Sequence, residues 1–169
     1  METRSVGALF RALNAAEVRY LVVGGLAVVA HGFLRATQDI DIVVQLQDDN
    51  IRRALIALSE LKYKPRAPVP ILDFADPNKR QAWIIEKHMT VFSLRSVDHP
   101  LTEVDIFVRE PFEFDEAFSA RVEMDVVPGV PAFIVSYAQL LELKREAARP
   151  QDLEDIRRLE HVREEREDG

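Results

Sequence analysis

The chain has 169 residues, which is enough for one domain with a sizeable core, or for a domain with a small helical annex. It contains no cysteine, so a disulfide framework and a cysteine-ligated zinc site are both excluded. Its net charge of −7 disfavours generic binding to a nucleic-acid backbone, although a small positive site for one nucleotide is compatible with that charge.

No segment has the pattern of a membrane span or a signal peptide. No apolar run approaches the length that a bilayer crossing requires. The N-terminal segment is amphipathic and carries Arg11 where a signal peptide would be apolar. We therefore expect no membrane association and a cytoplasmic location.

The N-terminal part of the chain predicts alternating helices and strands. Apolar residues at helical spacing predict an amphipathic helix from Thr3 to Glu17, and apolar runs predict buried strands at Tyr20–Val23 and Asp39–Val44. Between the strands, a Gly-Gly turn should lead into a short helix at Leu26–His31, with Gly32 as its C-terminal cap.

The middle of the chain predicts a helix followed by an irregular segment. Asp48 or Asp49 should cap the helix, which carries an apolar stripe from Ile51 to Leu61. The segment Lys64–Pro77 holds four prolines and is expected to be irregular, with a short strand at Ile71–Phe74.

A helix and a hairpin are expected next. Asp76 before Pro77 is typical of a helix start, so a helix should run from there to about Lys87. Alternating apolar residues at Met89–Leu94 and Thr102–Val108 predict the two strands of a hairpin.

The C-terminal part predicts two strands and two helices. The strands are expected at Val122–Val127 and Ala132–Ile134, around a Pro-Gly turn. A capping-box pattern at Ser136 opens a helix from Tyr137 to about Ala148, and a second helix follows Pro150.

Three aspartates are the candidates for a metal site. Side chains alternate along a strand, so Asp39 and Asp41 share one face while Ile40 and Ile42 point into the core. Two carboxylates this close repel each other unless a cation lies between them, and a divalent metal is the obvious candidate. Asp105 stands alone on an otherwise apolar strand and would complete a two-metal site if that strand lay beside the first.

Residues on either side of the short helix are suited to phosphate. Gly24 and Gly25 lack a Cβ, so their backbone can approach a phosphate closely. In the following loop, Arg35 and Thr37 either contact phosphate, or Thr37 only caps the loop. A metal site beside a phosphate-binding backbone segment is typical of enzymes that act on nucleotides.

The other chemistry-bearing residues are assigned to the structure. The four histidines lack a metalloprotease spacing, and neither a Ser-His-Asp triad nor a Walker-type loop can be assembled. Trp83, Phe92 and Phe107 are predicted to be core residues and not a platform for stacking a base.

The order of these features resembles the nucleotidyltransferase superfamily, which includes polymerase beta and the kanamycin nucleotidyltransferases. GG…HG…R.T.DIDIVV (Gly24 to Val44) is similar to the first motif of the AbiEii/AbiGii family, known mostly as toxins of toxin–antitoxin systems. LLELKREAARPQDLEDI (Leu140 to Ile156) resembles the Lys…Arg-Pro-x-Asp-x-x-Asp segment of the same family.

The resemblance implies roles for these residues. Asp39, Asp41 and Asp105 would be the catalytic carboxylates and the ligands of Mg²⁺. Gly24 and Gly25 would contact the nucleotide phosphates through backbone N–H groups.

The second motif would supply further nucleotide-binding residues. Lys144 would neutralise charge on the triphosphate as a flexible point charge. Arg149 and Asp152 are three residues apart and are expected to form an ion pair that fixes the two C-terminal helices. Arg35 and Thr37 would complete the nucleotide-binding set.

One position departs from the wider superfamily. Leu26 follows Gly25, where a Ser or Thr hydroxyl usually binds a phosphate. Either the affinity for nucleotide is therefore weak, or Thr37 serves instead.

The resemblance implies an α/β (α+β) nucleotidyltransferase fold, with a small, mixed and mostly antiparallel sheet, flanking helices and C-terminal helices. Residues 1–135 would form the core, and residues 136–169 a helical segment that closes one side of the active-site cleft, all within a single compact unit.

The implied function is Mg²⁺-dependent transfer of a nucleoside monophosphate from an NTP to a tRNA, a protein or a small molecule, as the toxin of a toxin–antitoxin system with an antitoxin partner. One alternative is an aminoglycoside-type nucleotidyltransferase, whose cationic substrate would suit an acidic cleft. A second alternative is a non-catalytic module that binds a nucleotide or a partner. A sugar-nucleotide transferase using Asp-x-Asp is disfavoured, because that motif normally lies on a loop after a Rossmann-like strand.

Overall fold

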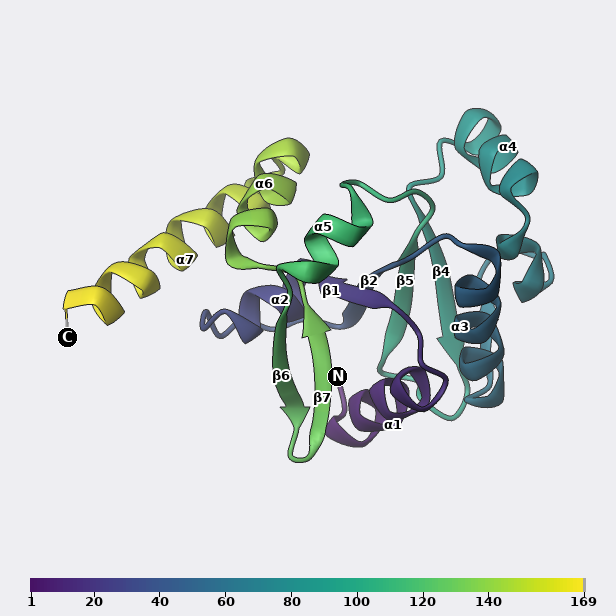
Figure 1. Cartoon of the computed structure of the whole chain (residues 1–169), viewed down its shortest axis with the longest axis horizontal. Helices are drawn as coiled ribbons and strands as arrows, with labels where there is room; N and C mark the ends of the chain where they lie inside the picture. The colour runs from purple at the N-terminus through teal and green to yellow at the C-terminus, as the bar shows by residue number, and fades with distance from the viewer. Residues whose placement is uncertain (169) are drawn as a thin grey trace.

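The computed structural model describes residues 1–168 as one seven-stranded sheet with helices packed on it (Figure 1). The strands are β1 (Tyr20–Val23), β2 (Asp39–Val44), β3 (Tyr63–Pro65), β4 (Val91–Ser96), β5 (Glu103–Phe107), β6 (Val122–Val127) and β7 (Val130–Ile134). The helices are α1 (Thr3–Ala15), α2 (Gly24–Ala30), α3 (Asp48–Glu60), α4 (Pro77–Lys87), α5 (Phe114–Ser119), α6 (Tyr137–Ala147) and α7 (Pro150–Asp168), with a 3-10 helix, η1, at Ile71–Ala75.

The sheet is mixed, as expected, and its strand order is β3-β4-β5-β2-β1-β7-β6. The pairs β2–β5 and β1–β7 are parallel, and the other four pairs are antiparallel. β2 is therefore the central strand. Residues from β1, β2 and β5, which are far apart in the sequence, meet there.

The core forms around this central strand. Ile40 and Ile42 of β2 are fully buried, as their alternation with the aspartates predicts. α1 and α3 pack against each other and against strands of the sheet, while α2 packs on β1 and β2 and contacts α6. No helix within residues 1–168 combines the length and the hydropathy of a membrane span.

Two predicted helix starts are confirmed by the capping bonds. The carboxylate of Asp76 accepts a hydrogen bond of 2.8 Å from the backbone N–H of Asn78 at the start of α4. The hydroxyl of Ser136 accepts one of 3.2 Å from the backbone N–H of Gln139 at the start of α6.

Other predictions need correction. The Gly-Gly pair is not a turn but the first two residues of α2. The N-cap of α3 is Gln47, so Asp48 and Asp49 do not cap the helix and lie in its first turn, where their charge still interacts favourably with the helix dipole. The strand expected at Ile71–Phe74 is wrong, because this segment is the 3-10 helix η1, which buries the Phe74 ring at 4.8 Å from Phe92.

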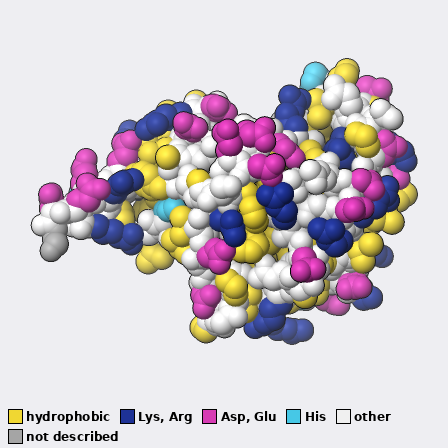
Figure 2. All heavy atoms as spheres, in the orientation of Figure 1, with side chains coloured by type: hydrophobic (Ala, Val, Ile, Leu, Met, Phe, Trp, Pro, Cys, Tyr) yellow, Lys and Arg dark blue, Asp and Glu magenta, His cyan; other side chains and the backbone are white. Residues whose placement is uncertain are grey.

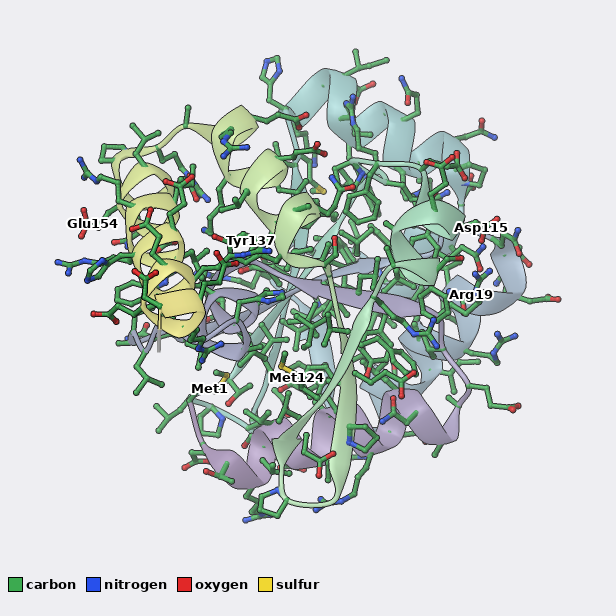
Figure 3. The ribbon with its side chains drawn as sticks, turned by 60° about the vertical axis from the view of Figure 1, so that its left-hand side comes forward. Met1, Arg19, Asp115, Met124, Tyr137 and Glu154 are labelled. Carbon is green, nitrogen blue, oxygen red and sulfur yellow. The ribbon has the colours of Figure 1, made fainter. Side chains whose placement is uncertain are left out.

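Two short elements, β3 and α5, had no sequence prediction. β3 has only three residues, too few to show an alternation. α5 is held by tertiary contacts: Asp115 forms a 2.9 Å ion pair with Arg19, the two labelled residues at the right of Figure 3. The same arginine lies over the Phe118 ring at 4.6 Å. Such contacts leave no local periodicity in the sequence.

Candidate functional site

Three carboxylates from two neighbouring strands lie together at the centre of the sheet. In the parallel pair β2–β5, Asp41 is directly opposite Asp105, and Asp39 is directly opposite Glu103. Because strand side chains alternate, Asp39 and Asp41 share the face of the sheet that Asp105 occupies. The structure thus brings together the three aspartates that the sequence analysis singled out.

The local electrostatics show that these carboxylates repel one another. Burial raises the pKa of Asp41 to about 6, and the negative charges of Asp105 and Asp39 contribute to that rise. Burial also raises the pKa of Asp39 above its usual value, assisted by Asp105 and Glu103. One carboxylate oxygen of Asp105, Oδ1, is buried with no hydrogen-bond partner. The site therefore holds negative charge that the protein itself does not satisfy.

These residues fit a divalent cation by donor type. Carboxylate oxygens are the ligands that Mg²⁺ prefers, and Asp105 Oδ1 has no hydrogen-bond partner within the described residues. Within residues 1–168, however, no three His, Cys, Asp or Glu side chains form a ready cluster for a metal ion. The aspartates therefore supply suitable ligands without defining a coordination geometry.

The two glycines bring the start of α2 against these side chains. Gly24 has a φ of +63°, and a Cβ at this position would overlap the carboxylate of Asp41. A Cβ on Gly25 would lie 2.7 Å from Thr37 Oγ1 and 2.8 Å from Arg35 Nη2. The position of Gly24 therefore requires glycine for both its backbone conformation and its contact with Asp41, whereas a Cβ at Gly25 would force the side chains of Thr37 and Arg35 to move.

Thr37 has a local role in its loop. Its hydroxyl donates a 3.2 Å hydrogen bond to the backbone carbonyl oxygen of Asp39, two residues along the chain. Of the two interpretations of Thr37, the structure therefore shows the loop-capping bond.

A network of ion pairs, formed by residues of α6, α7 and the turn between them, lies on the other side of the site from the aspartates. Lys144 is only 5% exposed, and its Nζ lies 3.1 Å from Asp152 Oδ1 and 2.7 Å from Asp155 Oδ2. The predicted pair of Arg149 and Asp152 is confirmed, with Arg149 Nε 2.7 Å from Asp152 Oδ2. Lys144 is therefore held between two carboxylates and is not the flexible point charge that was expected, whereas the side chain of Arg149 remains 75% exposed.

The sequence analysis did not select Asp155 as a site residue. It is fully buried, and its Oδ1 lies 3.3 Å from Arg35 Nε. Two signals were available in the sequence: Asp155 is the last aspartate of the Asp-x-x-Asp segment, and it follows Asp152 by three residues on a helix. Asp155 therefore links three elements: it lies on α7 and contacts Arg35 of the loop before β2 and Lys144 of α6. The network as a whole contains three cationic side chains and two carboxylates, so its net charge is +1.

A cleft of about 950 Å³ lies between these groups, and its lining includes residues of α6 and of the chain just after α4. Its lining includes every predicted site residue: Gly24, Gly25, Arg35, Thr37, Asp39, Asp41, Asp105, Lys144, Arg149 and Asp152. It also includes residues that the sequence analysis missed: Met89, Val91, Phe107, Arg109 and Pro111. Phe107 is therefore not only a core residue, although Trp83 and Phe92 are buried as predicted.

The cleft is not acidic, although an acidic cleft would suit the cationic substrate of the aminoglycoside-type alternative. Its lining holds four carboxylates (Asp39, Asp41, Asp105, Asp152) and four cationic side chains (Arg35, Arg109, Lys144, Arg149). The face drawn in Figure 2 likewise shows acidic and basic side chains intermingled. The excess negative charge of the chain is therefore spread over its surface and is not gathered in the cleft.

Repulsion at Asp41 predicts a pH-dependent stability. The folded chain, with a pKa of about 6 at Asp41 against a reference of 3.8, binds more protons between these values than the unfolded chain does. Its free energy of unfolding should fall as the pH rises through this window. At pH 8 without divalent metal, Asp41→Asn should have a free energy of unfolding about 3 kcal/mol higher than that of the wild type, as measured by chemical denaturation.

The control for this prediction is Asp98→Asn, which changes an exposed carboxylate outside the cleft. It should behave as the wild type does. An Asp41→Asn variant no more stable than this control at pH 8 would contradict the electrostatic interpretation.

The buried network predicts a contrast between two neighbouring residues. Lys144 and Arg35 both pair with the carboxylate of Asp155, and Asp155→Ala removes this shared partner. The substitution should therefore lower the free energy of unfolding by about 3 kcal/mol. Glu154→Ala removes an outward-pointing side chain of α7 (Figure 3), whose surface pairs with Arg157 and Arg158 contribute little. Chemical denaturation at pH 7 compares the two, and equal losses would rule out a structural role for the buried network.

The solved structures most informative for this geometry have the same fold. A lincosamide antibiotic adenylyltransferase, LnuA, matches with a TM-score of 0.61 at 15% identity, over 95% of this chain and 97% of that one. The antibiotic-resistance factor ANT(2'')-Ia matches with a TM-score of 0.57 at 15% identity, over 94% of this chain and 84% of that one. An antigenic nucleotidyltransferase-like protein from Paracoccidioides brasiliensis matches with a TM-score of 0.55 at 18% identity, over 92% of this chain and 72% of that one.

No curated protein matches the sequence significantly. The model of a family described as "Nucleotidyltransferase of unknown function (DUF6036)" matches residues 7–164. The superfamily resemblance is thereby confirmed, while the narrower AbiEii/AbiGii assignment stays a prediction. The chain belongs to this family of nucleotidyltransferases.

Proposed function

We propose that the protein transfers a nucleoside monophosphate from an NTP to an acceptor, with Mg²⁺ as its cofactor. The observation that carries this proposal is the register of β2 and β5, which sets Asp41 opposite Asp105 directly beside Gly24. A carboxylate set next to a side-chain-free backbone is what metal-bound polyphosphate requires.

In this proposal Asp39, Asp41 and Asp105 would hold Mg²⁺, which would supply positive charge for the triphosphate and lower the pKa of the attacking group. Asp105 aligns the attacking hydroxyl or amine and accepts its proton in this proposal. The attacking atom forms a bond to the α-phosphorus as the bond from that phosphorus to the bridging oxygen of pyrophosphate breaks. The products are the nucleotidylated acceptor and pyrophosphate.

The remaining groups bind the nucleotide. Gly24 and Gly25 offer backbone N–H groups to the phosphates, as their close approach to the site allows. The side chain of Arg149 is the exposed cation of the ion-pair network. In this proposal it pairs with the departing pyrophosphate, because a cation stabilises the negative charge that develops on the leaving group.

Lys144 and Arg35 contribute their charge from fixed positions, because buried carboxylates hold both of them. Asp152 assists by holding Lys144 and Arg149, and Thr37 by shaping the loop. Residues 136–169, with α6 and the start of α7 in the cleft wall, close one side of the site in this proposal.

The aspartates provide the direct test. Asp39→Asn and Asp41→Asn should each lower nucleotide transfer by about 10³-fold, because each removes a charged ligand for the metal. Pyrophosphate release and transfer of label from an α-³²P NTP are measured with total tRNA, a protein extract or an aminoglycoside as the acceptor. Thermal unfolding should show both variants folded, and Asp98→Asn serves as the control.

Two outcomes would count against this proposal. Full activity in either aspartate variant would remove the assignment of the carboxylates. Mg²⁺-NTP binding that persists unchanged in Asp41→Asn, without any turnover in the wild type, would instead favour a non-catalytic nucleotide-binding module.

The toxin role, with an antitoxin partner and a tRNA or protein acceptor, is a further part of the proposal and is supported by the motif resemblance. If the acceptor is essential, inducing the wild-type gene should arrest growth. Inducing Asp41→Asn should not, because the variant lacks transfer activity while keeping its fold. Growth curves with and without the neighbouring gene measure this, and unaffected growth with the wild type would contradict the toxin role.

A further inference from the structure

If the proposed function holds, the leaving pyrophosphate and the attacking acceptor occupy opposite ends of the cleft. In phosphoryl and nucleotidyl transfer, the attacking and leaving oxygens lie roughly in line on opposite sides of the phosphorus. The cations that suit pyrophosphate, Arg35, Lys144 and Arg149, come from the loop before β2 and from α6 and the turn after it. The acceptor should therefore enter from the opposite end, where β5 and β4 lie beyond β2 in the sheet.

That end of the cleft is largely apolar. Phe107 follows Asp105 by two residues, so both side chains lie on the same face of β5. Val91 of β4 is directly opposite Phe107 in the antiparallel pair β4–β5. Met89 and Pro111 also line the cleft. A half-buried phenylalanine in an apolar surround, next to the proposed proton acceptor, is suited to contact a flat ring.

The only charged side chain at this end, among the described residues that line the cleft, is Arg109. It is exposed and forms none of the ion pairs found within residues 1–168. An arginine free of carboxylate partners at the rim of an apolar pocket favours an anionic group on the ligand.

The carboxylates of the lining are all committed elsewhere. Asp39, Asp41 and Asp105 form the proposed metal site, and Asp152 is paired with Lys144 and Arg149. None remains to pair with the ammonium groups of a polycation, and burying such groups unpaired costs free energy.

We propose that the β4–β5 end of the cleft, defined by Met89, Val91, Phe107, Arg109 and Pro111, is the acceptor subsite, and that it takes an acceptor carrying a flat ring and an anionic group. A polycation of the aminoglycoside type is disfavoured. The ring contacts Phe107 and places the attacking group beside Asp105, while Arg109 pairs with the anion.

Two small alcohols of matched shape test the charge preference. 4-(Hydroxymethyl)benzoate and 4-(aminomethyl)benzyl alcohol share a ring and a hydroxyl but carry opposite charges, and kanamycin represents the polycations. Each is titrated by NMR into the full chain, with and without Mg²⁺ and an α,β-methylene NTP that fills the nucleotide site without reacting. The benzoate should bind about tenfold more tightly than the ammonium compound, and kanamycin should bind most weakly.

Variants connect this preference to the subsite. Arg109→Glu should invert the ratio of the two affinities, whereas Arg95→Glu should leave it unchanged, because Arg95 is an exposed arginine on β4 outside the cleft lining. Phe107→Ala should weaken both aromatic probes about equally. Phe107→Leu keeps the packing volume and should bind them with intermediate affinity, which preserves the test if the alanine variant unfolds.

The outcomes separate this inference from the proposed function. Tighter binding of the ammonium compound or kanamycin, an unchanged ratio in Arg109→Glu, or no binding of either aromatic probe would overturn the acceptor subsite. Failure of the NTP analogues to bind, or Asp39→Asn with normal transfer, would overturn the proposed function. The probe ratio measured without nucleotide tests the subsite in either case.

Discussion

The like-charge repulsion between carboxylates on β2 and β5 is the constraint around which the functional part of this structure is arranged. The parallel register sets Asp41 opposite Asp105, and burial of Asp41, together with the negative charges of Asp105 and Asp39, raises its pKa to about 6. A fold selected for stability alone would place an apolar or paired residue there. An arrangement that keeps such charges together is typical of a functional site.

The wall formed by α6 and α7 complements this negative charge without cancelling it. Lys144 and Arg149 both lower the pKa of Asp41, so their charge reaches the carboxylates across the cleft. Their direct partners are Asp152 and Asp155, which hold them in place. A buried ammonium fixed between two carboxylates has lost its rotational freedom, so a bound polyphosphate would not have to order it again. Rigid placement of the cations is therefore consistent with a site preorganised for anionic ligands.

Similarity of fold indicates which scaffold the chain has, whereas the chemistry of the cleft bears on which acceptor it takes. The likeness to antibiotic adenylyltransferases, at 15% identity, establishes a common fold over nearly the whole chain and leaves the acceptor open. In the proposed acceptor subsite at the β4–β5 end of the cleft, the described lining residues include Phe107 and Arg109 and no carboxylate outside the proposed metal site. Function is carried by the site, and one scaffold supports many acceptors.

Sequence alone determined the parts of this protein that depend on neighbours in the chain. Strand alternation predicted that Asp39 and Asp41 share a face, and helical spacing predicted the pair of Arg149 and Asp152, because both follow from the local geometry of one element. The position of Asp105, alone on an otherwise apolar strand, was enough to select it as the third carboxylate.

Only the tertiary structure decided what depends on contacts between distant elements. The turn expected at the glycine pair is the start of a helix, and Gly24 lies directly against the carboxylate of Asp41 from β2. Burial converted Lys144 from an expected mobile charge into a fixed one, held in part by Asp155. The exposure of Phe107 in the cleft, and hence the apolar character of one end of it, likewise follows from sheet order. Burial and long-range register are properties of the packed chain, and no short stretch of sequence contains them.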